Sequence, residues 1–356
     1  MTRLMGREFG KGELLRRIGH LSQVAGIRRM TLSDGVEEGV RIADVRTGSG
    51  LRFQVTLDRG MDISMAEFRG VPLAWRSPTG DAHPSFFDGH GKGWLRTFAG
   101  GLMTGCGMTS LGAPCTDEGA ELGLHGRLSH LPATGVAVEH RWEGEECVMA
   151  VEGSMREAVI FGENLHLRRR IETRLGSSVV SLRDRVANEG PARTPLMMLY
   201  HINLGWPLVD AGARLLLHAT ATTPRDPDAA SGLDRAREFS DPVAGFREQV
   251  YYHDLAPGED GYATVLLRGA AGGIGLQVRY RQRERPRFIE WKMTGEGTYV
   301  VGLEPANCRV SGRAAERAAG TLQFLEPGEV REFALEFALI EGEDAIAAAV
   351  RSHALS

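Results

Sequence analysis

The chain has 356 residues, of which 42% are hydrophobic and 25% are charged. This composition is typical of a globular protein and excludes a disordered or fibrous one. With 42 Lys and Arg against 46 Asp and Glu, the net charge of −4 argues against nucleic acid or an anionic membrane surface as a partner.

Four cysteines are too few for a disulfide scaffold, and no Cys pair has the spacing of a zinc site. The first ten residues lack the apolar core of a signal peptide. No window approaches the roughly 18–20 apolar residues of a membrane span. We therefore expect a cytoplasmic protein with reduced thiols and no structural metal.

Helices are expected at the two ends of the chain. Apolar residues recur at helical spacing between Gly12 and Val24, which predicts an N-terminal helical extension within residues 1–25. The segment Glu343–His353 is rich in Ala with charged ends, which predicts a C-terminal helix.

Between these ends the hydrophobic period changes to two, which is typical of strands. The alternating segments lie near residues 53–57, 71–75, 165–171, 180–186, 196–200, 274–280 and 333–339. Frequent Gly and Pro separate them, which predicts an all-β sandwich or barrel. The polar stretch 222–237 is too short for a linker, so we expect one domain over residues 1–356, with this stretch as a loop.

The first candidate segment for chemistry is residues 57–63, where a strand runs into a glycine turn. Arg59 and Asp62 would then lie at a strand-to-strand corner. They could pair with each other in a hairpin turn, or Arg59 could point its guanidinium into a pocket and bind hydroxyls or an anionic group.

Two further segments carry histidines. His125 precedes Gly126, next to which a ligand can approach closely, although a surface-loop histidine is the commoner case. His201 and Asn203 share the apolar face of an expected strand, so they need partners if buried. His201 is either a satisfied core histidine or a general acid or base lining a pocket. The glycine cluster between Gly100 and Gly107 lacks the Lys and Ser/Thr of a phosphate loop, which excludes a nucleotide site there.

The fourth segment is the most informative, because Glu304 ends an apolar strand that should be buried. Burial penalises a carboxylate and raises its pKa toward neutrality, where it can accept a proton. Pro305 is expected to end strand pairing, so that Glu304 faces a cleft. Upstream, Trp291 could stack on a sugar or simply pack in the core, and Lys292 is one of only three lysines.

Together and in this order, these segments resemble the galactose mutarotase-like superfamily, the aldose 1-epimerases. Leu124-His125-Gly126 resembles the family's first histidine motif, the strand around His201 its second, and Gly302-Leu303-Glu304 its glutamate strand. Arg59 is a looser match to the family's early arginine. The resemblance implies a large β-supersandwich with a sugar-binding cleft, and it points to a bacterial branch known only as aldose-epimerase-like.

The mechanism expected from this resemblance interconverts the α and β anomers of a monosaccharide by general acid and base catalysis. Glu304 would be the base and His201 the acid, while His125 and Arg59 would hold the ring oxygen and neighbouring hydroxyls. The remaining candidates for substrate contacts are Asp62, Lys292, Asn203 and Trp291. No metal or organic cofactor is required.

Two other classes of function remain open at this level. A non-catalytic carbohydrate-binding protein could use the same cleft, and so could another sugar enzyme such as a lyase, a glycosidase or another epimerase. A glycosidase would pair Glu304 with Asp62 or Glu290 across the bond to be cleaved. The identity of the sugar, and whether it carries an anionic group, also stay open. An exposed edge strand would allow a homodimer.

Overall fold

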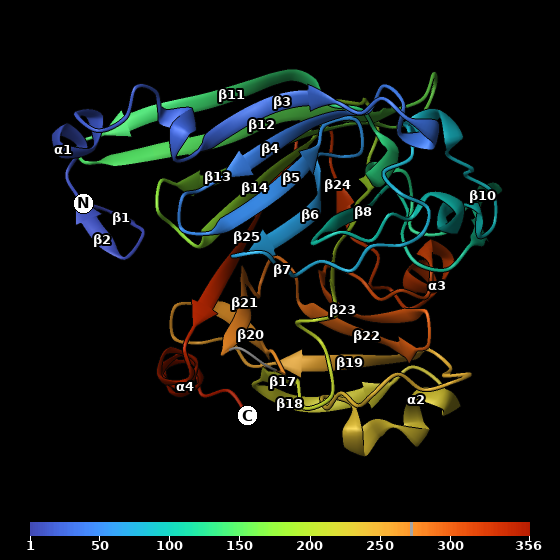
Figure 1. Cartoon of the computed structure of the whole chain (residues 1–356). Coiled ribbons are helices and arrows are strands. Elements are labelled where there is room, and N and C mark those ends of the chain that lie inside the picture. The colour runs from blue at the N-terminus through green and yellow to red at the C-terminus, as the bar shows by residue number, and fades with distance from the viewer. Residues whose placement is uncertain (271–272) are drawn as a thin grey trace.

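Antiparallel strands in two facing layers make up the protein (Figure 1). The computed structural model describes residues 1–270 and 273–356. One layer is an eight-stranded sheet. In spatial order its strands are β11 (Thr134–Glu143), β12 (Glu146–Ala158), β13 (Asn164–Arg174), β14 (Val179–Asn188), β25 (Val330–Glu341), β21 (Ile274–Arg281), β20 (Tyr262–Arg268) and β17 (Arg214–Leu217).

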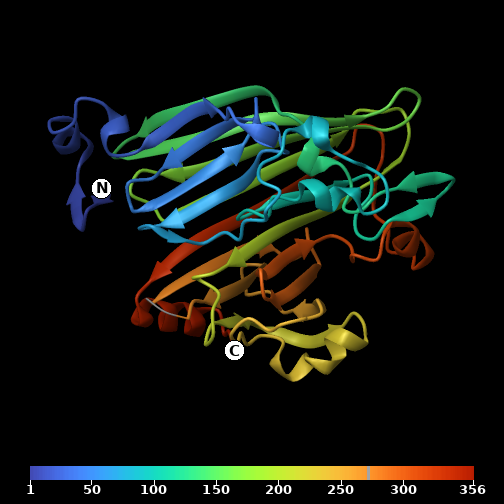
Figure 2. The same ribbon diagram turned by 45° about the vertical axis from the view of Figure 1, so that its right-hand side comes forward.

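The facing layer consists of two smaller sheets, seen beside each other in Figure 2. The six-stranded sheet has the order β18 (Ala219–Pro224), β19 (Gln249–Leu255), β22 (Arg287–Gly295), β23 (Thr298–Ala306), β16 (Met197–Gly205) and β8 (Thr104–Met108). The five-stranded sheet has the order β3 (Gly26–Thr31), β4 (Arg41–Arg46), β5 (Leu51–Thr56), β6 (Asp62–Phe68) and β7 (Val71–Pro72). Single bridges from Ile63 to Met103 and from Ala74 to Leu204 join the two sheets.

The remaining elements are short. Three strand pairs lie outside the layers: β1 (Thr2–Leu4) with β2 (Arg7–Phe9), β9 (Cys115–Asp117) with β10 (Ala120–Leu122), and β15 (Thr194–Pro195) with β24 (Phe324–Leu325). The helices are α1 (Lys11–Leu15), α2 (Pro227–Ser231), α3 (Arg313–Ala318) and α4 (Glu343–Ser352). Among the described residues, no helix is long and apolar enough to cross a membrane.

The alternating pattern of the sequence becomes the core between the layers. Inward residues such as Phe53 of β5, Leu167 of β13 and Leu303 of β23 belong to one hydrophobic cluster that joins all three large sheets. Because strand side chains alternate, the other residues of these strands face outward or toward the site. The predicted all-β sandwich with a C-terminal helix is therefore confirmed.

Two local predictions were wrong. The N-terminal segment has a strand pair, the short helix α1 and a separate 3₁₀ turn at Leu21–Gln23, because Gly12 and Gly19 weaken a continuous helix and His20 is fully extended. The stretch 222–237, expected to be a loop, contains the end of β18 and helix α2, which the side chain of Asp226 caps.

A charged residue lies inside the core. Arg169 of β13 is completely buried and donates two hydrogen bonds to its cross-strand neighbour Asp184, at 2.8 and 2.7 Å. It also donates to the carbonyl of Gly60 at 2.7 Å. Tyr200 of β16 donates its hydroxyl to the same Asp184 at 2.7 Å. This network ties the eight-stranded sheet to the strand that carries His201.

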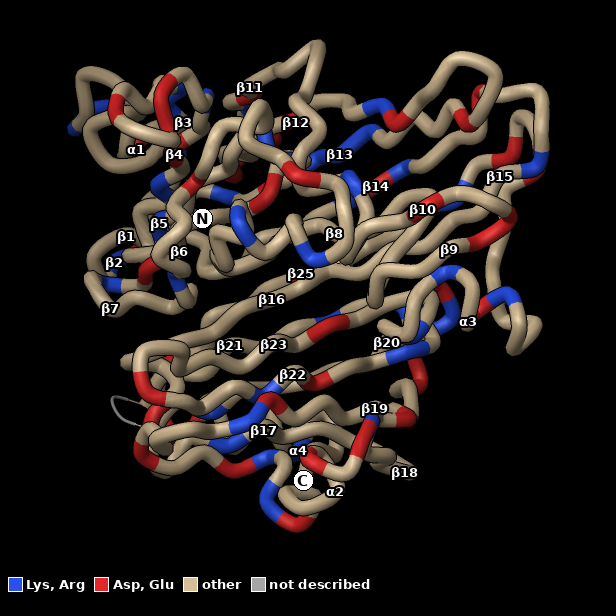
Figure 3. Tube along the Cα trace, turned by 90° about the vertical axis from the view of Figure 1, so that its right-hand side faces the viewer, with Lys and Arg blue, Asp and Glu red and all other residues tan. Residues whose placement is uncertain are grey.

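Charges of both signs are interspersed along the strands and loops (Figure 3). Most surface arginines have a carboxylate partner, as in the cluster of Arg170 with Glu139, Glu152 and Glu172. This arrangement agrees with the near-balanced composition, in which no large surplus of either sign exists.

Candidate functional site

Strand register brings His201 and Glu304 together. β16 pairs with β23 so that Leu199 lies opposite Ala306 and Ile202 opposite Leu303, which puts His201 directly across from Glu304. Their side chains lie on one face of the six-stranded sheet, with Nε2 of the imidazole 3.1 Å from Oε1 of the carboxylate. Pairing continues through Pro305 to Ala306, so Glu304 lies within the strand, and the prediction that Pro305 ends the pairing was wrong.

Gly302, two residues before the glutamate, leaves the space that this pair needs. A Cβ atom at this glycine would lie 2.8 Å from Oε1 of Glu304, 3.0 Å from Cε1 of His201 and 3.1 Å from Cβ of Trp291. The first of these distances is shorter than real Cβ contacts, and the other two are tighter than nine in ten of them, so the neighbouring side chains would have to shift. The absence of a side chain therefore lets Glu304 and His201 approach Trp291 on the neighbouring strand β22.

The pair opens into a cavity of about 580 Å³. This is within the usual size range for small-molecule sites, which are largely apolar with a few polar groups. Aromatic rings form much of the wall, and the charged groups lie at a few points. The main lining side chains are Lys92, Trp94, Phe98, His125, His201, Arg225, Glu248, Trp291 and Glu304.

His125 reaches the cavity from a loop in an uncommon backbone conformation. Its φ is 57°, and backbone hydrogen bonds on both sides hold it there, to the carbonyl of Gly112 at 3.0 Å and from the amide of Gly107 at 2.9 Å. Its ring centroid lies 6.0 Å from that of His201 and 4.8 Å from that of Trp94. Within the described structure, Nδ1 of His125 and Nδ1 of His201 are both buried without a hydrogen-bond partner.

Burial dominates the electrostatics of these groups. It raises the pKa of the Glu304 carboxyl to about 8, and the charge of nearby Glu248 adds to the rise. Burial lowers the pKa of His201 to about 3, with His125 as a second cause, and lowers the pKa of His125 to about 4. At neutral pH the uncharged imidazole and the protonated carboxyl are therefore the favoured forms, and one dissociable proton lies between Glu304 and His201.

Arg59 and Asp62 do not line this cavity, contrary to the prediction. Arg59 is buried and donates to the carbonyls of Ala82 and Thr97, both at 2.6 Å. Asp62 accepts from the amide of Gly105 at 2.8 Å, and its pKa is raised to about 7, chiefly by burial. Asp62 also accepts from Nη1 of Arg169 at 3.4 Å. Both side chains hold segments together that are far apart in sequence.

Lys292 and Glu290 face away from the cavity, because they alternate with Trp291 along β22. Nζ of Lys292 donates to the carbonyls of Arg235 and Glu238, at 2.7 and 2.6 Å, and so fastens the segment after α2 to the sheet. Lys292 therefore does not line the cavity, and neither Glu290 nor Asp62 lies where it could pair with Glu304 across a bond in this cavity.

Asn203 shares the face of His201 but lies behind it. Its amide donates to the carbonyl of Gly101 at 3.1 Å and to that of His201 at 2.9 Å. It is fully buried, and the structure does not bring it to the cavity. It instead holds the glycine-rich segment before β8 against β16.

Sequence reasoning missed several lining residues. Trp94 and Phe98, whose rings stack at 4.4 Å, come from the single-turn segment Gly93–Thr97 and the residue after it. Two aromatic residues just before the glycine cluster could have indicated that this segment lines a pocket. Arg225 and Glu248 come from the ends of β18 and β19, and nothing in their local sequence distinguishes them from surface charges.

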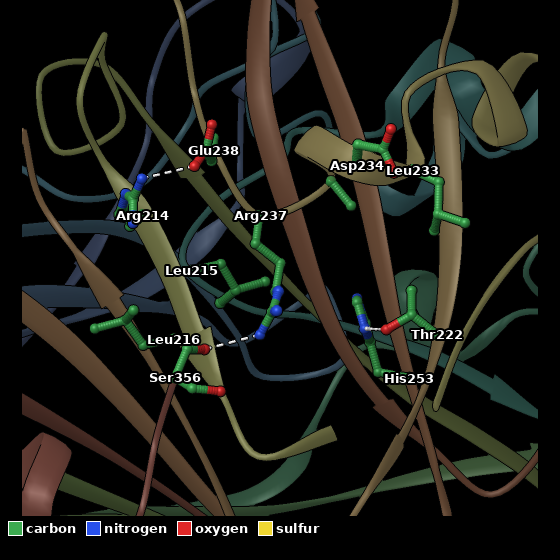
Figure 4. Close-up of a pocket in the computed structure, with 11 residues that line it drawn as sticks. Arg214, Leu215, Leu216, Thr222, Leu233, Asp234, Arg237, Glu238, His253 and Ser356 are labelled. Carbon is green, nitrogen blue, oxygen red and sulfur yellow. Dashed lines mark hydrogen bonds and ion pairs between the residues drawn. The ribbon is translucent and has the colours of Figure 1, made fainter. Parts of the chain in front are cut away.

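A second hollow of about 410 Å³ lies by the opposite face of the six-stranded sheet, which carries His253 (Figure 4). Its polar side chains largely satisfy one another. The hydrogen-bonded pairs are Arg214 with Glu238 at 2.6 Å, Arg237 with the Ser356 carbonyl at 2.8 Å, and Thr222 with His253 at 2.9 Å. None of the predicted site residues lines it.

Comparisons with known proteins agree with this fold. Residues 37–339 match the family described as a domain of unknown function, DUF4432. Comparison with curated proteins finds no significant match. A Klebsiella pneumoniae structure, provisionally named an aldose 1-epimerase, is similar at 27% identity and a TM-score of 0.88, over 92% of this chain and 86% of that one.

More distant structures share the fold. A galactose mutarotase-like protein from Clostridium acetobutylicum is 12% identical with a TM-score of 0.62, over 90% of this chain and 99% of its own. Galactose 1-epimerase from Lactobacillus acidophilus is 14% identical with a TM-score of 0.57, over 90% of this chain and all of its own. These likenesses confirm the predicted β-supersandwich.

Proposed function

Because this chain belongs to the DUF4432 family and has a galactose mutarotase-like fold, we propose that it interconverts the α and β anomers of an aldose. The observation that carries the proposal is the buried pair of Glu304 and His201, 3.1 Å apart, which opens into a cavity with aromatic walls. A carboxyl and an imidazole at this distance supply the two proton transfers that ring opening requires.

In the proposed reaction, Glu304 takes the proton of the anomeric hydroxyl and His201 gives a proton to the ring oxygen. The bond between the anomeric carbon and the ring oxygen breaks, and the anomeric carbon becomes an aldehyde. Rotation about the bond to the next carbon is followed by closure with both proton transfers reversed. His125, whose Nδ1 has no protein partner among the described residues, is the further group placed to hydrogen-bond the ring or a hydroxyl.

The shared proton sets the protonation state that this scheme needs. A protonated Glu304 beside a neutral His201 contains as many protons as a carboxylate beside an imidazolium. Transfer of the proton across the 3.1 Å between Oε1 of Glu304 and Nε2 of His201 therefore converts the resting pair into the base and acid used in the reaction. The pair is competent while it holds this proton and loses competence when the proton dissociates.

We expect kcat/KM to be nearly constant around neutral pH and to fall as the pH rises through about 8. The pKa of Glu304 is raised to about 8 by burial, so above this pH the pair has lost its proton and His201 has none to deliver. Anomer exchange measured by NMR from pH 6 to 10, after subtraction of the spontaneous rate, checks this. A rate per enzyme that rises through pH 8 would show instead that an isolated carboxylate is the active form.

The function itself is tested by saturation-transfer NMR between the anomeric protons of a panel of aldoses. The panel includes neutral hexoses and pentoses, uronates and sugar phosphates, because Lys92 and Arg225 at the cavity could favour an anion. Exchange above the spontaneous rate with at least one sugar supports the proposal. Binding without exchange would identify a carbohydrate-binding protein, and release of reducing sugar from a glycoside would identify a hydrolase.

Replacing Gly302 by Ala is expected to lower kcat by about tenfold or more, since a Cβ atom there collides with Glu304 and His201 and shifts both from their 3.1 Å contact. The measurement is anomer exchange at saturating sugar, with the melting temperature measured in parallel. Gly12→Ala is the matched control, because no atom lies within 4 Å of the added Cβ. Full activity of Gly302→Ala would contradict the role of this glycine.

A further inference from the structure

Glu248 lies at the edge of the cavity and has both carboxylate oxygens engaged. Its Oε2 accepts a hydrogen bond from the indole Nε1 of Trp291 at 3.0 Å. Its Oε1 accepts from Nη2 of Arg225, also at 3.0 Å. All three side chains line the cavity, so this is a bridge at the cavity wall and not a distant surface pair.

Arg225 gives the bridge a fixed base. Its backbone amide donates to the carbonyl of Val250 at 2.8 Å, and its Nε donates to Asp226 at 2.7 Å. Asp226 in turn accepts from the amide of Ala229 and so begins helix α2. The guanidinium is thereby held at the edge of the six-stranded sheet, and Glu248 is held by the guanidinium.

Trp291 lies beside His201 of the proposed catalytic pair. Its ring centroid lies 5.4 Å from that of His201 and 6.4 Å from that of Phe98. Its cross-strand neighbour on β23 is Gly302, which has no side chain to pack against the indole. The neighbouring rings contact the indole without hydrogen bonds, so its hydrogen bond to Glu248 is the polar contact that fixes the plane of the indole.

We propose that Glu248, held by Arg225, is a positioning residue that fixes the indole of Trp291 as the flat wall against which the sugar ring lies. This inference rests on the proposed anomerisation and extends it to the groups that select the substrate. Glu248 does not take part in proton transfer, because both its oxygens are engaged by protein donors. It acts on substrate affinity through Trp291.

Glu248 has a second, separable effect through its charge. It raises the pKa of Glu304, although burial is the larger cause. Replacement by Gln keeps an oxygen that can accept from the indole but removes the charge, whereas replacement by Ala removes both. The two variants therefore separate the geometric effect of Glu248 from its electrostatic effect.

The first measurement needs no activity. In protein labelled with ¹⁵N-Trp, the indole signal of Trp291 is assigned by its absence in Trp291→Phe. Glu248→Ala is expected to shift that signal and speed its hydrogen exchange, while Glu248→Gln leaves it close to the wild-type position. An unchanged Trp291 signal in Glu248→Ala overturns the proposal, whether or not the protein acts on a sugar.

The second measurement is the kinetics of anomer exchange. Glu248→Ala is expected to raise KM about tenfold, equivalent to about 1.4 kcal/mol, with a smaller effect on kcat. Trp291→Phe raises KM as well, and adding Glu248→Ala to it brings little further change, because the two residues act through one hydrogen bond. Glu248→Gln keeps KM near the wild-type value but moves the alkaline fall in kcat/KM to a lower pH.

Controls and outcomes distinguish this proposal from the function on which it rests. Glu259→Gln removes an exposed carboxylate remote from the cavity and is expected to change none of these quantities. A shifted indole signal with unchanged KM would overturn the role of Trp291 as the sugar wall. If the wild-type protein catalysed the anomer exchange of no aldose, the proposed function would be wrong. The indole signal would still show whether Glu248 holds Trp291.

Discussion

Replacing Glu304 by Gln is expected to reduce anomer exchange by about 10²–10⁴-fold, to near the spontaneous rate. The amide cannot take the proton of the anomeric hydroxyl, nor exchange a proton with Nε2 of His201. Because Gln has the same shape, the fold should be retained. Exchange rates of wild type and variant at equal sugar concentration check this, and a variant that keeps its rate would remove Glu304 from the mechanism.

The same substitution has a consequence for stability that can be measured separately. Since burial raises the pKa of Glu304 to about 8 from an ordinary value near 4.5, the folded state binds more protons than the unfolded state between these values. Wild type therefore loses stability as the pH rises through this window, and Glu304→Gln lacks that loss. Urea unfolding at pH 5 and pH 9 should show the variant gaining relative stability at pH 9. If the variant gained no relative stability at pH 9, the pKa of Glu304 would not be raised in the folded protein.

Replacing Arg169 by Leu is expected to lower the free energy of unfolding by about 3–5 kcal/mol, the largest stability effect in this fold. The substitution removes both hydrogen bonds to Asp184 and the one to Gly60, and leaves a fully buried carboxylate without its counter-charge. Tyr200 would remain as a single donor to that carboxylate. Urea unfolding followed by circular dichroism measures the change.

Arg168 next to it in β13 is the matched control. Its side chain is 64% exposed and pairs with Glu152 on the neighbouring strand. Solvent already screens this pair, so Arg168→Leu should change the free energy of unfolding by only about ±0.5 kcal/mol. Equal losses in the two variants would contradict the assignment of the stabilising effect to the buried network.

His201 and Glu304 could be predicted from the sequence because the side chains of a strand alternate regularly between its two faces. Alternation along each strand predicted which face of β16 carries His201 and which face of β23 carries Glu304. The order of the motifs suggested in addition that these two strands are neighbours, as they are. The same alternation excludes Lys292, which sits one position from Trp291 and must face the other way. Reading these two neighbours as one binding segment ignored that rule.

The other misses concern partners that no local pattern reveals. Arg59 binds the carbonyls of Ala82 and Thr97, and Asp62 binds the amide of Gly105, all of them backbone groups in other segments. A buried Arg that holds loops and an Arg that binds a sugar look identical in sequence. Glu248 is the opposite case, a residue that the sequence did not single out. Its hydrogen bonds with Arg225 and Trp291 form only because the fold brings these side chains next to it.

The residues around the cavity differ in how easily they can change during evolution, because some lie on paired strands and others on the connections between strands. His201 and Glu304 are on paired central strands, flanked on both sides and locked in register. Lys92, Trp94, His125 and Glu248 come from connections between strands, which can change length and composition without disturbing that register. Under the proposed function, a lineage could thus exchange one sugar for another by remodelling these connections while keeping the Glu304–His201 pair.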